Sequence, residues 1–231
     1  MLQRVLEPEV MDTAEEARDY DAMDHASVNR VFVTDFLVYL GTQGPAADRD
    51  KPIGHILDVG TGTAQIPIEI CSRGLFCEIT AIDLAEEMLR IGRENLRRTG
   101  LENRIRLVRW DAKEMPCREA TFDAAISNSI IHHIPDPAAV FAEIVRVTRR
   151  GGVIFVRDLV RPADETTLRQ LVEQYAAGAN DHQKKMFGDS LHAALSLAEV
   201  RAQVGALGFS PESVRQTTDR HWTWQATKTT S

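Results

Sequence analysis

Three aspartates lie at the ends of short apolar runs, and two glycines follow the first of them. Asp58 stands just before Gly60 and Gly62, whereas Asp83 and Asp111 come at the ends of the next two runs. Because glycine has no side chain, a ligand can approach the main chain closely at such a turn. A carboxylate such as Asp83 can accept two hydrogen bonds from the vicinal hydroxyls of a ribose, each contributing about 1.5–3 kcal/mol. A single aspartate often starts a loop, but three on consecutive runs favour a nucleotide-like ligand.

These acids need a sheet to bring them together, and the pattern from residue 53 onward predicts one. Short apolar runs alternate there with helical periodicity, which is typical of a parallel α/β sheet. The predicted strands cover residues 53–59, 76–82, 104–109, 122–127 and 152–158, with helices at about 64–73, 85–99 and 137–148. In open α/β sheets, ligands bind at the carboxyl ends of the strands, beside the switch in strand order. We therefore expect the three aspartates at one edge of the sheet.

The segments on either side of this core predict further helices and a last pair of strands. Helices are expected at 13–40, 164–178, 182–194 and from a capping box at Ser196 and Glu199 to Gly208, and strands at 212–217 and 221–225. The result is a seven-stranded, mostly parallel sheet with helices on both faces and a helical cap. We expect residues 1–52 to form the cap and residues 53–231 the ligand-binding domain, with a helical insertion at 159–195.

The composition narrows the class of protein. The chain has 231 residues, of which 43% are hydrophobic and 26% charged, as in an ordinary globular protein. Its net charge of -7 disfavours a nucleic-acid surface, since phosphate binding needs clustered Lys and Arg. The three cysteines form no ligand spacing with histidine, so we expect reduced thiols, a cytoplasmic protein and no metal site. No run has the roughly 20 apolar residues of a membrane span.

Two nucleotide sites compete for the glycine turn. A dinucleotide fingerprint needs a third glycine where this chain has Gln65, and that glycine lets the helix pack closely. NAD is therefore disfavoured. A Walker A loop is excluded, because no Gly-Lys-Ser/Thr sequence follows the turn.

Several short motifs together resemble the class I S-adenosylmethionine (SAM) dependent methyltransferases, closest to the small-molecule branch that includes the ubiquinone and menaquinone methylases. The matching segments are "LDVGTGT" (57–63), "AIDL" (81–84), "WDA" (110–112), "FDAAISNSIIHHI" (122–134) and "VTRRGG" (147–152). Each motif is weak alone, and the set is specific in combination. The resemblance implies a Rossmann-like fold, SAM as cofactor and S-adenosylhomocysteine (SAH) as product. Ala64 stands where many members have Gly, and Arg150 where they have Pro.

The resemblance also implies roles for individual residues. Asp58 and the backbone of residues 60–62 would hold the methionine part, Asp83 the ribose, and Asp111 with Ala112 the adenine. Leu84 would pack on the adenine, and Asn128 would lie near the sulfonium. The cofactor-binding residues expected in this way are Tyr20, Asp58, Gly60, Thr61, Gly62, Asp83, Leu84, Met88, Asp111, Ala112 and Asn128. Tyr20 resembles an aromatic that closes over the methionine end, and a plain packing role is equally open.

Methyl transfer from a sulfonium is an in-line displacement, so alignment of the reactants is its main requirement. Near-attack positioning can supply roughly 7–11 kcal/mol, whereas a general base typically adds roughly 10²–10⁴-fold. If a base or other catalytic group is used, the candidates are His132, His133 and Asp158, with a structural role favoured for the two histidines. The residues expected to line a substrate pocket are His182, Phe187, Ser190, Arg161 and His221.

Three functions remain open at this point. The first is a methyltransferase that acts on an O, N, C or S nucleophile of a small molecule. The second is a protein or RNA methyltransferase, which the acidic net charge disfavours. The third is a SAM-binding sensor or regulatory subunit without methylation. For partners we expect a small-molecule substrate, no nucleic acid and no membrane span, and we allow for a homodimer.

Overall fold

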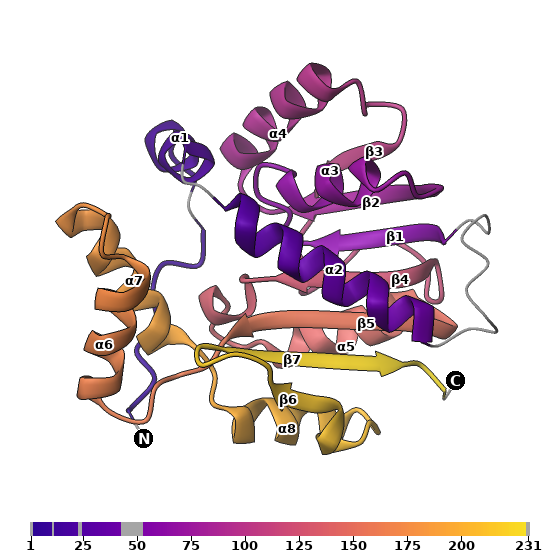
Figure 1. Cartoon of the computed structure of the whole chain (residues 1–231). Coiled ribbons are helices and arrows are strands. Elements are labelled where there is room, and N and C mark those ends of the chain that lie inside the picture. The colour runs from indigo at the N-terminus through magenta and orange to yellow at the C-terminus, as the bar shows by residue number, and fades with distance from the viewer. Residues whose placement is uncertain (1, 11, 23–24, 43–52, 230–231) are drawn as a thin grey trace.

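A single seven-stranded sheet runs through the middle of the molecule (Figure 1). The computed structural model describes residues 2–10, 12–22, 25–42 and 53–229. The strands are β1 (Gly54–Val59), β2 (Cys77–Asp83), β3 (Ile105–Arg109), β4 (Phe122–Asn128), β5 (Thr148–Leu159), β6 (Val214–Gln216) and β7 (His221–Thr227). This confirms the mostly parallel, Rossmann-like sheet that the sequence predicts.

The strand order is β3-β2-β1-β4-β5-β7-β6, and only β7 runs antiparallel to its two neighbours. From β1 the chain moves outward through β2 and β3, and then returns to place β4 on the other side of β1. The order therefore switches between β1 and β4. In the register, Asp58 pairs with Ala81 on one side and with Ile126 on the other, so the carboxyl ends of β1, β2 and β4 lie at one edge.

Helices cover both faces of the sheet. α2 (Ala26–Thr42), α3 (Gln65–Ser72) and α4 (Glu86–Thr99) pack on one face, and α5 (Ala138–Val147) and α8 (Leu197–Ala206) on the other. Three further helices lie at the carboxyl ends of the parallel strands, at the left of Figure 1: α1 (Ala14–Ala22), α6 (Glu165–Tyr175) and α7 (Asp181–Ala193). Short 3-10 turns are η1 (Ile131–His133) and η2 (Pro211–Ser213).

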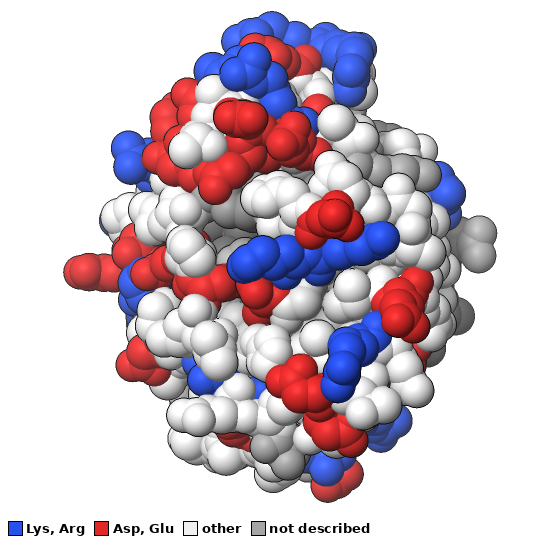
Figure 2. Space-filling model, turned by 90° about the vertical axis from the view of Figure 1, so that its left-hand side faces the viewer, with Lys and Arg blue, Asp and Glu red and all other residues white. Residues whose placement is uncertain are grey.

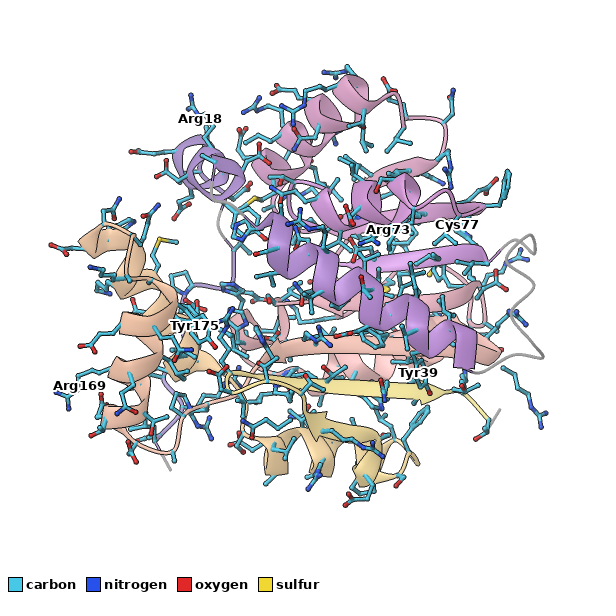
Figure 3. The ribbon with its side chains drawn as sticks, viewed as in Figure 1. Arg18, Tyr39, Arg73, Cys77, Arg169 and Tyr175 are labelled. Atoms are coloured by element: carbon cyan, nitrogen blue, oxygen red, sulfur yellow. The ribbon has the colours of Figure 1, made fainter. Side chains whose placement is uncertain are left out.

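α2 is fixed to the sheet by aromatic side chains that surround Phe155 of β5. The ring centroids of Phe32, Phe36 and Tyr39 lie 5.3, 5.8 and 6.3 Å from that of Phe155. Tyr39, labelled in Figure 3, points from the helix toward the sheet. Spacings of three and four residues place these rings on one helix face. Each fully buried aromatic contributes about 1.5–3 kcal/mol, so α2 belongs to the core on this face.

The opposite face is centred on two tryptophans of β7. Trp222 and Trp224 are fully buried, and their rings lie 6.2 and 5.6 Å from that of Phe141 in α5. Phe209 packs against Trp224 at 5.3 Å. The segment whose role the sequence left open, "HWTWQ", is therefore the core of the second face.

The structure corrects two boundaries. The helix predicted over 13–40 is two helices, because α1 ends at Ala22 and α2 begins at Ala26. The fifth strand begins at Thr148 instead of residue 152, and its register with β4 shifts where Thr148 pairs with Phe122 and Val153 with Ala124. Within the described ranges, no helix has the length and apolar character needed to cross a membrane.

The contacts around Phe155 give a first prediction. Phe36→Ala should lower the free energy of unfolding by about 3–5 kcal/mol, because a buried ring is lost and a cavity remains. Val38→Ala, on the exposed side of the same helix at 61% exposure, should change it by less than about 0.5 kcal/mol. Urea unfolding followed by circular dichroism measures both. Equal effects of the two variants would contradict the docking of α2 on β5.

Candidate active site

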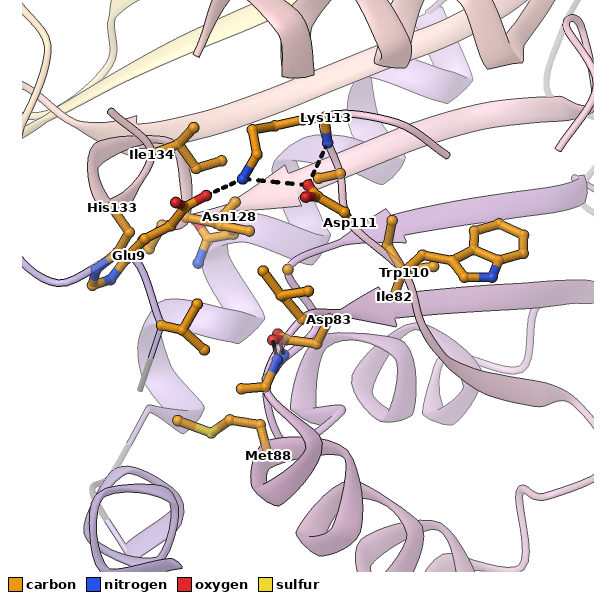
Figure 4. Close-up of a pocket in the computed structure, with 18 of the residues that line it drawn as sticks. Glu9, Ile82, Asp83, Met88, Trp110, Asp111, Lys113, Asn128, His133 and Ile134 are labelled. Carbon is orange, nitrogen blue, oxygen red and sulfur yellow. Dashed lines mark hydrogen bonds and ion pairs between the residues drawn. The ribbon is translucent and has the colours of Figure 1, made fainter. Parts of the chain in front are cut away.

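A cavity opens at the carboxyl ends of β1, β2 and β4, where the strand order switches (Figure 4). The space inside it that the centre of a water-sized sphere can reach is about 110 Å³. The predicted cofactor residues that line it are Tyr20, Gly60, Gly62, Asp83, Leu84, Met88, Asp111, Ala112 and Asn128. Residues that are 108 positions apart in the chain thus meet in one place, as the switch-point rule predicts.

The glycine turn after β1 is tied to β2 through its backbone. The amides of Gly60 and Thr61 both donate to the carbonyl of Ile82 at 2.9 Å, and the Gly62 amide donates to Asp83 Oδ2 at 2.8 Å. Gly60 has φ +74°, and a Cβ there would lie 2.3 Å from the side chain of Ile130. Only glycine fits this position without displacing the cavity wall.

Ala64 and Gln65 stand where other glycine turns have glycine, and the conformation of the first and the hydrogen bonds of the second show how the fold accommodates them. Ala64 has φ +67°, a left-handed conformation that glycine adopts more readily. Gln65 accepts a hydrogen bond from Asn29 Nδ2 at 3.1 Å and donates one to Asp21 Oδ1 at 3.2 Å. The side chain at the third glycine position therefore links α3 to both α1 and α2.

Asp83 presents a carboxylate to the cavity at the end of β2. Its two oxygens accept hydrogen bonds from the amides of Gly62 and Ala85, at 2.8 and 2.9 Å, which fix its orientation. Burial raises the pKa of Asp83, and these amides oppose the shift. In Figure 4 the side chains of Ile82 and Met88 lie near it, so one wall joins a carboxylate to apolar groups.

Three buried polar atoms beside the turn have no hydrogen-bond partner in the part of the chain that the structure describes. They are Oδ2 of Asp58, Oγ1 of Thr61 and Oδ1 of Asn128. Asp58 is 1% exposed and lies behind the cavity wall with Thr61. Burial raises the pKa of Asp58 to about 7; the nearby hydroxyl of Thr61 opposes this shift, and the charge of Asp83 adds to it. Buried polar groups are normally satisfied, so this arrangement fits a ligand that carries donors and a positive charge, as the amino-acid part of SAM does.

The described residues before α1 close the cavity from the other side. Glu9 forms an ion pair with Lys113, which also lies 3.4 Å from Asp111. Tyr20 of α1 reaches the turn, where a side chain at Gly62 would meet its ring at 3.5 Å. Glu9, Val10 and Lys113 also line the cavity and were not predicted from the sequence. No local pattern marks them, because their contacts join distant segments.

Of the predicted catalytic residues, His133 lines the cavity, and His132 and Asp158 lie behind it. Asp158 is buried at the end of β5, where it bonds His132 Nδ1 and accepts hydrogen bonds from the amides of Ile131 and His132. It thereby holds η1 in place. The Asp158 carboxylate raises the pKa of His132 although burial opposes this, whereas burial lowers the pKa of His133 to about 3. His133 is therefore neutral near pH 7.

Glu7 is a further residue that the sequence analysis missed. Its Oε1 lies 3.5 Å from Nε2 of His132 and 3.1 Å from Nδ1 of His133. Burial raises the pKa of Glu7. A glutamate in the segment "LEPE" gave no signal, because only the fold brings it to the histidine pair.

None of the five predicted substrate residues lines this cavity. Arg161 is buried and bonded to Glu199 at 2.8 and 2.9 Å, and His221 is bonded to Thr218 at 2.9 Å. His182 is exposed, Phe187 packs against an apolar cluster around Leu191, and Ser190 donates to Glu7 Oε2 at 3.3 Å. A role for these five with a substrate stays a prediction.

Comparison with known proteins agrees with this geometry. Residues 57–156 match the family described as "Methyltransferase domain". Over these residues the chain is similar to the SAM-dependent methyltransferases. Malonyl-[acyl-carrier protein] O-methyltransferase of Geobacter sulfurreducens is 32% identical over 194 residues, which cover 84% of this chain and 66% of the relative. Demethylmenaquinone methyltransferase of Porphyromonas gingivalis is 32% identical over 46% of this chain and 44% of its own length.

This chain thus spans less than two thirds of the length of these curated relatives. Solved structures agree on the fold. A SAM-dependent methyltransferase from Aquifex aeolicus matches with TM-score 0.60 and 17% identity, over 94% of this chain and 98% of that one. The plantazolicin methyltransferase BpumL, solved with SAH, matches with TM-score 0.67 and 15% identity, over 93% and 90%.

The place of Asp83 in the methyltransferase domain gives a second prediction. Asp83→Ala should weaken SAM binding by roughly 10²–10⁴-fold, the equivalent of two charge-assisted hydrogen bonds. Glu102→Ala, an exposed acid in the loop before β3, should bind SAM normally. Calorimetric titration with SAM measures both, and circular dichroism checks that the fold is intact. Unchanged SAM affinity in folded Asp83→Ala would refute the assignment of the ribose site.

The raised pKa of Asp58 gives a third prediction. Below about pH 7 this carboxyl is neutral in the free protein, and a ligand ammonium group favours its ionised form, so binding releases a proton. SAM affinity should therefore rise with pH between 5.5 and 7, by up to about tenfold per unit. The raised pKa of Asp83 acts in the same direction.

Asp58→Asn is the control for this pH dependence, because its side chain carries no titrating proton. It should bind SAM more weakly at pH 7, with a flatter profile across the range. Keeping to pH 7 and below avoids deprotonation of the SAM amino group, whose ordinary pKa is about 7.7–8.0. A wild-type profile as flat as that of the variant would show that Asp58 does not hold the ammonium group.

Proposed function

We propose that the protein transfers a methyl group from SAM to an O, N, C or S nucleophile of a small molecule. The observation that carries this proposal is the cavity at the switch point. There the Asp83 carboxylate meets a glycine turn, beside unpartnered polar atoms of Asp58, Thr61 and Asn128. These groups fit the ribose and amino-acid parts of SAM, and apolar residues such as Leu84 and Met88 fit its adenine.

When bound, SAM supplies an electrophilic methyl group on a sulfonium. The protein's own residues would hold SAM and orient it toward the acceptor. Asp83 and the backbone of the glycine turn would fix the ribose and methionine ends, and Asn128 would face the reacting end from β4. Glu9 and Tyr20 line the cavity and would help to exclude water from bound SAM. Alignment of this kind can supply roughly 7–11 kcal/mol of the barrier, so the chemistry rests mainly on positioning.

The acceptor is proposed to be small because the cavity is covered. Residues 2–10 pass over the carboxyl ends of the strands together with α1, and α6 and α7 stand beside them. Figure 2 shows this side of the molecule, on which acidic and basic side chains are mixed. The acids gather at the height of α1, whose first turn carries Glu15 and Glu16. This acidic rim supports a small molecule over a nucleic acid, which would need clustered cations.

The same arrangement of helices around the cavity supports different roles for different parts of the chain. We propose that residues 1–52 act as a cap that α2 anchors to the sheet through the contacts of Phe32 and Phe36 with Phe155, and that residues 53–231 act as the SAM-binding domain, with residues 159–195 inserted beside the acceptor end. Residues 43–52, which join the two parts, lie outside the described residues. A cytoplasmic location is proposed from the sparse cysteines, and a homodimer stays a prediction.

The fourth prediction concerns the acceptor. With labelled SAM and a metabolite extract, the wild-type protein should transfer label to a compound of low molecular mass, and Asp83→Ala should not. Chromatography with mass spectrometry identifies the compound that gains a methyl group. Label found on macromolecules alone would overturn the small-molecule proposal. SAM binding without transfer to either fraction would favour a sensor or regulatory subunit.

A further inference from the structure

Glu7, His132 and His133 form a compact cluster at one wall of the cavity. The roles described above do not account for the contacts of Glu7 with the two histidines. The three residues come from a segment near the start of the chain and from the 3-10 turn after β4. One ligand-type atom from each, a carboxylate oxygen or a ring nitrogen, lies within 4.8 Å of the other two. Two histidines and one carboxylate are a common ligand set for Zn²⁺ in catalytic sites.

The distances match the edges of a metal coordination shell. Oε1 of Glu7 lies 3.5 Å from Nε2 of His132 and 3.1 Å from Nδ1 of His133. Around a tetrahedral zinc ion with bonds near 2.1 Å, neighbouring ligand atoms are about 3.4 Å apart. Two of the three distances between the ligand atoms therefore match those around a bound cation, and the third, between the two histidine nitrogens, is at most 4.8 Å.

The hydrogen bonding inside the cluster is incomplete. Oε1 of Glu7 and Nδ1 of His133 have no hydrogen-bond partner among the described residues, although the two atoms are close to each other. Their side chains are only 13% and 16% exposed, so solvent gives little compensation. Buried polar atoms without partners are costly. A shared cation would satisfy both atoms together.

Neighbouring residues form hydrogen bonds with the side chains of the cluster, as second-sphere residues do with metal ligands. His132 directs Nδ1 to the buried Asp158, which leaves Nε2 free to face Glu7. The other oxygen of Glu7 accepts a hydrogen bond from Ser190 in α7 at 3.3 Å. A histidine ligand that bonds a carboxylate through its second nitrogen is the usual arrangement at metal sites. The nearby Arg4 donates to backbone carbonyls, those of His132, Ile134, Pro135 and Ala193.

We propose that Glu7, His132 and His133 bind a divalent cation of the zinc class at the acceptor end of the cavity. His133 and Asn128 both line the cavity, so a cation bound by His133 would lie at the cavity wall, and three protein ligands would leave one coordination position open. An open position of this kind takes an anionic oxygen or sulfur atom. The acceptor class is therefore a hydroxyl, enol or thiol compound that binds the metal through its reactive atom. The role of the metal in binding the acceptor rests on the proposed function, whereas metal binding itself does not.

The fifth prediction tests metal binding directly. After treatment with a chelator, the full chain should bind one Zn²⁺ in calorimetric titration, and Co²⁺ should give the visible absorption of a tetrahedral site. Asp158→Asn should weaken zinc binding by roughly 10–100-fold, as loss of an outer partner does. Glu7→Gln and His133→Ala remove ligands and should weaken it more than Asp158→Asn does. His182→Ala removes an exposed histidine outside the cluster and should leave zinc affinity unchanged.

SAM titration of the same samples separates the two proposals. Zinc binding without SAM binding would keep the metal site and overturn the methyltransferase proposal. SAM binding by a wild-type protein that takes up no zinc would overturn the metal site alone. Zinc binding that survives in folded Glu7→Gln with full affinity would also overturn it. Glu7 lies outside the helices and strands, so this variant keeps the ligand test independent of folding.

Discussion

The hydrogen bonds between the glycine turn and the end of β2 are the constraint on which the rest of the site depends. Two amides of the turn share the carbonyl of Ile82, and a third is held by Asp83. These bonds place the main chain of one strand end against the carboxylate of its neighbour. Every other group of the cavity is arranged around that junction, whether it comes from β4, from the loop after β3 or from the segment before α1.

The physical pattern of the sequence was enough to predict the sheet. Apolar runs that alternate with helical periodicity can be buried in few ways, and the acids at strand ends then converge by topology. Leu84 and Met88, which the family resemblance suggested, line the same cavity, and their contact with a cofactor stays a prediction. Asp58 is placed correctly beside the turn, but it lies behind the wall instead of in it.

The contacts of the segment before α1 could not be predicted in this way, because they join residues that are distant in the sequence. Glu7 meets a turn more than a hundred residues away, and Glu9 pairs with Lys113. Two predicted pocket residues show the same limit. Arg161 and His221 have the chemistry of pocket residues, but in the fold they bond to Glu199 and Thr218 and do not line the cavity. Residue type shows what a side chain is able to do, and only the packing shows where it does so.

The short segment before α1 contacts both halves of the cavity. Its Glu9 bonds to Lys113 beside the adenine-side residues, and its Glu7 contacts the two histidines at the other wall. Because Glu7 and Glu9 lie on one short segment, a displacement that breaks the Glu9–Lys113 ion pair would also disturb the contacts of Glu7 with the histidines. A ligand held at one end of the cavity would then be coupled through this segment to a ligand held at the other end.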